Sequence, residues 1–172
     1  EQHCAASGVF TVGDERFEIS GYGLRDKSWG PRHWQAIEWY RWCPMNFGRD
    51  FGMMLSVIGD GKGGARQGGM VFRDGIYDLI KECVIDSDWD ENGYQTALRA
   101  KVKTEAGKTY EVTGQVTSLI PLRNRRTAPD GTELHTRITE GMTEYRCGDL
   151  VGYGLSEYLD QIIDGKPNGK QR

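Results

Sequence analysis

A regular alternation of side-chain character runs from Tyr94 to Lys103. Successive residues of a β-strand point to opposite faces of the sheet, so every second residue shares a face. One face carries the more apolar set: Tyr94, Thr96, Leu98, Ala100 and Val102. The other face carries the polar set: Gln95, Arg99, Lys101 and Lys103. The pattern predicts a strand that is buried on one face only, followed by a similar strand over residues 110–120.

Short apolar runs separated by turn signals extend this pattern along the chain. Asp74-Gly75 and Asp130-Gly131 are tight-turn dipeptides, and the chain holds 24 glycines. Further strands are predicted over residues 8–12, 16–20, 37–43, 51–58, 69–73, 76–85, 132–147 and 152–162. Strands joined by hairpins lose their exposed edges when the sheet closes. The sequence therefore predicts an all-β fold, an antiparallel lipocalin-like barrel, with a β-sandwich as the alternative.

The length of the chain fits a single domain. A chain of 172 residues can bury a sizeable core. We expect one lipocalin-like β domain over residues 1–163. Residues 164–172 form a polar tail, which we expect to be frayed.

The charge balance argues against a nucleic-acid binder. The formal net charge is −3, so the basic surface that nucleic acid requires is absent overall. One local basic run contains Arg123, Arg125 and Arg126. We interpret it as a solvated loop, and the alternative is a site for a phosphate or an acidic partner.

Cysteine usage and hydropathy favour a cytoplasmic protein without bound metal. The four cysteines form no C-x-x-C pair, so we expect free thiols rather than a zinc site or a disulfide framework. The histidines also lack the spacing of metal ligands, and we predict no cofactor. No apolar stretch is long enough to span a membrane.

A six-residue pattern occurs near both ends of the chain. Residues 21–26 and 152–157 share the form G-Y-G-L-x-acid, which ends in Asp26 and Glu157 respectively. In each copy the acid has the same alternation phase as the leucine. A leucine-bearing face is usually buried, so both carboxylates are expected to point inward, where they must be paired or protonated. The alternatives are chance, or two strands that need similar bends.

The segment from Gly13 to Trp34 resembles a motif of the hydroxyneurosporene synthase (carotenoid hydratase-like) family. The matching residues are Arg25, Asp26, Ser28, Trp29, Gly30, Arg32 and Trp34. The resemblance implies a C-terminal lipocalin-like domain, with a preceding N-terminal lipocalin-like domain as a partner. The family motif has histidine where this chain has Lys27. An ordinary lysine stays protonated near neutral pH, so any acid–base role of that histidine would be lost.

Hydration of an alkene needs a proton donor, a group that handles water and a wall that stabilises a cation. A carboxylic acid kept protonated by an apolar pocket can donate the proton. We assign Asp26 as the acid and Glu157 or Glu140 as its partner. Aromatic faces stabilise positive charge. The candidate ligand-binding residues are Tyr22, Arg25, Trp29, Arg32, Trp34 and Trp42.

The same residues fit other roles. Arg25, Asp26 and Trp29 could form a structural corner in which aspartate caps a loop and tryptophan plugs the barrel end. We predict a domain that binds an apolar small molecule, such as a terpenoid, steroid or lipid, in a hydratase- or isomerase-like protein. The barrel interior is the expected cavity. The alternative is a non-catalytic scaffold or domain-pairing module.

Overall fold

The computed structural model describes residues 1–31 and 34–171 of the chain. A hairpin is formed by β1 (Gln2–Val12) and β2 (Glu15–Arg25). The barrel strands are β3 (Trp39–Asn46), β4 (Phe51–Gly59), β5 (Ala65–Arg73), β6 (Ile76–Trp89), β7 (Gln95–Thr104), β8 (Thr109–Thr127), β9 (Glu133–Cys147) and β10 (Leu150–Ile163). Short elements complete the described part: β11 (Lys166–Pro167) and the 3-10 turns η1 (Trp34–Ala36) and η2 (Asn168–Gln171).

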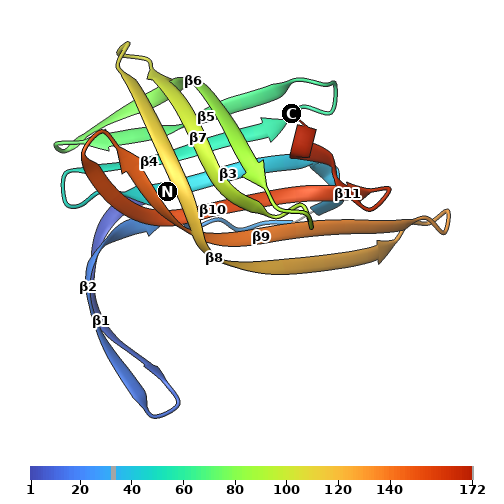
Figure 1. The fold of residues 1–172 in the computed structure, drawn as a ribbon, viewed down its shortest axis with the longest axis horizontal. Helices are drawn as coiled ribbons and strands as arrows, with labels where there is room; N and C mark the ends of the chain where they lie inside the picture. The colour runs from blue at the N-terminus through green and yellow to red at the C-terminus, as the bar shows by residue number, and fades with distance from the viewer. Residues whose placement is uncertain (32–33, 172) are drawn as a thin grey trace.

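Within the described residues, β3 to β10 form a closed eight-stranded antiparallel barrel (Figure 1). Each strand pairs with the next along the chain, and β10 also pairs with β3 to close the ring. Gly75 and Gly131 have φ angles of 81° and 87°, in the left-handed region that the Asp-Gly turns require. The predicted antiparallel barrel is therefore confirmed, and the sandwich alternative is not observed.

Side chains fill the interior of the barrel. Met45, Met53, Tyr145 and Tyr158 are among its largest fully buried side chains. The hydroxyl groups of Tyr158 and Ser87 are hydrogen-bonded at 2.7 Å across the core. The interior of an eight-stranded barrel is just wide enough for side chains to fill. Here the interior is a packed core rather than the ligand cavity that the sequence led us to expect inside the barrel.

A β-bulge changes the face on which the first residue of β7 lies. Asp88 pairs with Ala97 and Trp89 pairs with Gln95, so Thr96 is the extra residue. Gln95 is consequently buried, and its side chain bonds to Thr139 and to the Ser156 carbonyl, both at 2.8 Å. We expected Gln95 on the polar face and Thr96 on the buried face, and this was wrong. Simple alternation assumes that no residue is inserted, and the bulge at Thr96 exchanges the two faces.

Two segments expected to be irregular are part of the folded structure. The run Arg123 to Arg126 lies on β8 rather than in a solvated loop, because β8 and β9 continue together to Thr127. The tail does not fray: β11 pairs with the end of β10, and the Gly169 N–H donates to Asp160 at 2.8 Å. Both corrections reflect pairing with distant residues, which local composition does not show.

The β1–β2 hairpin hangs away from the barrel as a long arm (Figure 1). It is longer than the predicted strands over residues 8–12 and 16–20, and eleven residue pairs join its strands.

The four cysteines are free thiols, as predicted. No helix in the described part of the chain has the length and apolar character needed to cross a membrane.

Candidate functional site

Two carboxylates meet on the outer wall of the barrel. Glu140 on β9 and Glu157 on β10 are directly opposite each other in the antiparallel ladder. They lie in a groove of about 280 Å³ whose other lining is largely apolar. The remaining lining residues are Trp34, Ile37, Tyr40, Leu122, Ile138 and Leu159. An apolar concave surface with a few polar groups is the usual composition of a small-molecule site.

Glu157 faces outward, which corrects the expectation drawn from the G-Y-G-L-x-acid pattern. Its neighbours Ser156 and Tyr158 point into the core and are fully buried. Alternation therefore sends Glu157 and Leu159 to the outer face. That face is nevertheless covered here by another segment of the chain, so that Glu157 is half-buried and Leu159 is only 3% exposed. The face that carries Leu159 is therefore buried, as expected. It is buried by a segment packed on the outside of the barrel and not by the barrel core.

The covering segment is the 3-10 turn η1 with the residues that follow it. The Gln161 side-chain amide donates hydrogen bonds to the backbone carbonyls of Trp34 at 2.7 Å and Ile37 at 2.8 Å. Gln35 donates to the Asn124 side chain at 3.0 Å. These three bonds fix η1 against β8 and β10, so that Trp34 and Ile37 form one wall of the groove.

The environment of the two carboxyl groups favours their protonated forms. Burial raises the pKa of Glu157, and the charge of Asp26 raises it further, although the Tyr40 hydroxyl opposes this by donating a hydrogen bond to the carboxylate. Burial also raises the pKa of Glu140, with a second contribution from the charge of Glu157. Desolvation and a neighbouring like charge both disfavour ionisation. The pair is therefore suited to hold a proton that solvent-exposed carboxylates would release.

The structure brings several predicted site residues together. Trp34, Glu140 and Glu157 line the groove. Trp42 on β3 is directly opposite Glu157, and its indole N–H donates to the Glu1 carboxylate at 3.2 Å. Asp26 is exposed just after β2, so its predicted inward orientation was wrong, yet its charge still acts on Glu157.

Other predicted residues lie elsewhere. Tyr22 is exposed on the hairpin, where the Arg49 guanidinium lies 6.0 Å from its ring. Arg25 is exposed at the base of the hairpin. Trp29 is 84% exposed and plugs no barrel end. Arg32 falls outside the described residues.

Sequence reasoning missed part of the groove. The missed lining residues are Ile37, Tyr40, Leu122, Ile138 and Leu159. One signal for the carboxyl pair was present: Gly148-Asp149 is a glycine-containing two-residue turn, and Gly148 has a φ of 58°. A two-residue turn pairs Cys147 with Leu150, and counting seven residues outward on each strand reaches Glu140 and Glu157.

The raised carboxyl pKa values predict a pH-dependent stability. Between the ordinary glutamate pKa of about 4.3 and the raised values, the folded chain binds more protons than the unfolded chain. The free energy of unfolding therefore falls as pH rises through this window. Glu157→Gln should flatten that fall and be more stable than wild type above the window. Chemical denaturation from pH 4 to 8 measures this, with the exposed Glu105→Gln as control; an unchanged slope in Glu157→Gln would contradict the assignment.

No group of three or more His, Cys, Asp or Glu residues within the described ranges is arranged to hold a metal ion.

Comparison with protein families gives one match: a family described as a domain of unknown function (DUF7064) matches residues 1–162. No curated protein matches the chain, and no solved structure matches it.

Proposed function

We propose that this chain, which belongs to the DUF7064 family of domains of unknown function, binds an apolar small molecule. The binding site is the groove beside the Glu140–Glu157 carboxyl pair. The observation that carries this proposal is the position of two adjacent carboxyl groups with raised pKa in an otherwise apolar groove. Carboxyl groups held partly protonated by their surroundings are typical of acid–base sites.

The size of the groove limits the ligand. At about 30 Å³ for each water-sized group, a volume of 280 Å³ holds roughly ten such groups. A ten-carbon terpenoid, or the end of a longer lipid, matches that volume. Because the groove is on the barrel wall, a longer chain can extend along the surface. Terpenoids and short lipids are therefore the ligand class we assign.

The carboxyl pair supports a hydration or isomerisation step. In hydration, protonated Glu157 donates its proton to one alkene carbon, and the π electrons form the new C–H bond. The cation left on the other carbon lies near the ring of Trp34, whose face attracts positive charge. Water adds to that carbon, and its extra proton passes to Glu140 or back to Glu157. Isomerisation uses the same first step but ends with loss of a proton from a neighbouring carbon.

A charge placed in the groove should abolish ligand binding. We expect wild type to retain terpenoids from a mixed terpenoid and steroid extract in native mass spectrometry. Leu122→Glu should retain none, because Leu122 lines the groove and a carboxylate there would repel an apolar ligand. The variant should still fold, because Leu122 is 42% exposed and lies outside the barrel core. The matched control is Leu79→Glu, at a leucine 63% exposed on β6. Equal retention by both variants would place the ligand elsewhere.

Turnover distinguishes an enzyme from a binding domain. With geraniol as the substrate, Glu157→Gln should lower the rate of hydration by at least about 100-fold, the usual contribution of a positioned general acid. Binding should persist, because glutamine has nearly the same shape. If wild type binds geraniol but produces no hydrated or isomerised product, the domain binds without catalysis.

A second candidate function is pairing with another protein domain, and the β1–β2 hairpin favours it. Four of its exposed apolar side chains share one face of the hairpin, namely Phe10, Val12, Phe17 and Ile19, and Val9 lies on the other face. Exposed apolar patches of this kind commonly mark protein contacts. A second lipocalin-like domain, as the sequence resemblance implies, is the partner we assign. Co-purification of the two domains, lost in Phe10→Ser/Phe17→Ser, would support this function.

A further inference from the structure

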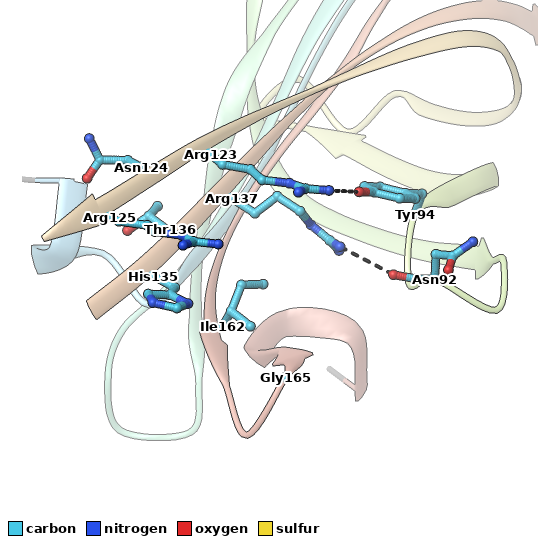
Figure 2. Close-up of a pocket in the computed structure, with 10 residues that line it drawn as sticks. All are labelled: Asn92, Tyr94, Arg123, Asn124, Arg125, His135, Thr136, Arg137, Ile162 and Gly165. Atoms are coloured by element: carbon cyan, nitrogen blue, oxygen red, sulfur yellow. Dashed lines mark hydrogen bonds between the residues drawn. The ribbon is translucent and has the colours of Figure 1, made fainter. Parts of the chain in front are cut away.

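A second pocket lies at the end of the barrel where β8 and β9 extend beyond the other strands (Figure 1), and Figure 2 shows the residues that line it. Its volume is about 480 Å³. Its lining includes Asn92, Tyr94, Arg123, Arg125, His135 and Arg137. Arg123 and Arg137 are adjacent on the ladder to Leu122 and Ile138, which line the outer groove. Alternation places the two sites on opposite faces of the β8–β9 ribbon.

Basic side chains lie directly opposite one another on β8 and β9. Arg123 is directly opposite Arg137, and Arg125 is directly opposite His135. Like charges directly opposite each other destabilise a sheet. Nothing acidic is among the pocket's lining residues, and none of the ion pairs formed within residues 1–31 and 34–171 involves these arginines. Among the described residues, positive charge thus gathers here with no carboxylate paired to it.

Arg137 is the most deeply buried member of this cluster, only 9% exposed. Its guanidinium donates to the carbonyl oxygens of Asn92, at 3.3 Å, and Gly93. The Nε–H is buried and has no hydrogen-bond partner within residues 1–31 and 34–171. Backbone carbonyls satisfy individual donors but do not neutralise a buried cation, which normally requires a paired charge.

Tyr94 holds two of the arginines in place. The Arg137 guanidinium lies over its ring at 4.5 Å, and Arg123 donates to its hydroxyl at 3.2 Å. Figure 2 shows Arg123 and Arg137 extending in the same direction from neighbouring strands toward the β6–β7 loop. Two guanidinium groups fixed in this way offer planar sets of N–H donors that match the oxygens of a phosphate or carboxylate.

We propose that this pocket binds the phosphate group of a small phosphorylated molecule. Three arginines suit a phosphate monoester, which carries close to two negative charges, better than a carboxylate, which carries one. The volume leaves space beside the phosphate for the rest of the molecule. This site goes beyond the outer groove and does not depend on its ligand.

Calorimetric titration with inorganic phosphate and glycerol 3-phosphate tests the proposal. Both should bind wild type, and acetate should bind more weakly. Arg125→Gln and Arg123→Gln should each weaken glycerol 3-phosphate binding at least tenfold. Arg126→Gln removes the same charge from the other face of β8 and should change the affinity less than twofold.

Several results would overturn the proposal. One is the absence of binding heat with either phosphate compound. Another is an equal loss in Arg126→Gln and Arg123→Gln, which would indicate general charge attraction rather than a site. Binding only to vesicles that contain phosphatidic acid, and not to glycerol 3-phosphate, would assign the arginines to a lipid surface instead. Because Arg123 and Arg125 are exposed, their variants avoid the folding risk of Arg137→Gln.

Discussion

Asp160→Asn is expected to lower the free energy of unfolding by about 3–5 kcal/mol, the usual effect of removing one partner of a buried ion pair. Asp160 and Arg41 form a two-bond pair at 3.0 and 3.1 Å, with side chains only 3% and 4% exposed. Asparagine keeps the shape but leaves the Arg41 charge buried without a counter-charge. It also weakens the acceptor for the Gly169 N–H, which holds the C-terminal tail.

Urea or guanidinium denaturation at neutral pH measures this effect. The matched control is Asp88→Asn, which removes a carboxylate from an exposed pair with Arg99 at 2.8 Å. Water screens an exposed pair of this kind, so its loss should change the free energy of unfolding far less than the loss of the buried pair. Comparable losses in the two variants would show that Asp160 and Arg41 are not buried together as described.

Gly69→Ala should destabilise the barrel by about 3 kcal/mol or more, because strain and overpacking each cost roughly 1–3 kcal/mol. Gly69 has a φ of 124°, and a Cβ there would lie 1.9 Å from the Met54 carbonyl oxygen on the paired strand. Neither backbone can move without breaking the β4–β5 ladder.

The neighbouring glycine provides a control for this prediction. Gly68 has an ordinary negative or extended φ, and a Cβ there would meet no atom within 4 Å. Gly68→Ala should therefore be neutral, or stabilising by up to about 1 kcal/mol through the unfolded state. Thermal melts of the two variants test the pair. If Gly69→Ala has the same melting temperature as wild type, β4 and β5 do not approach each other as closely as described.

Most of the barrel could be predicted from the sequence because its signals are local. The alternation from Leu98 to Lys103 and the turns at Gly75 and Gly131 are each visible within a few residues. What local patterns cannot show is which of the two faces is inside. Glu157 and Leu159 share a face with apolar neighbours, yet the core is on the side of Ser156 and Tyr158.

The candidate site was predictable only in part, for the same reason. Glu140, Glu157, Trp34 and Trp42 were identified by residue type, and the structure places them near one another. The cover formed by η1 could not be foreseen, because its position depends on hydrogen bonds from Gln161, more than a hundred residues away. Asp26 was assigned by motif, but it lies outside the core, and Glu157 is the better-placed acid.

The most direct test of the account is to locate the bound ligand by methyl NMR of the intact chain with geraniol. We expect shifts at the groove methyl groups of Ile37, Leu122, Ile138 and Leu159. The core methyl groups of Leu55 and Leu98 should not shift. That result would place an apolar ligand on the outer wall beside the two glutamates. Shifts confined to the core or to the β1–β2 hairpin, or none at saturating geraniol, would contradict the proposed function.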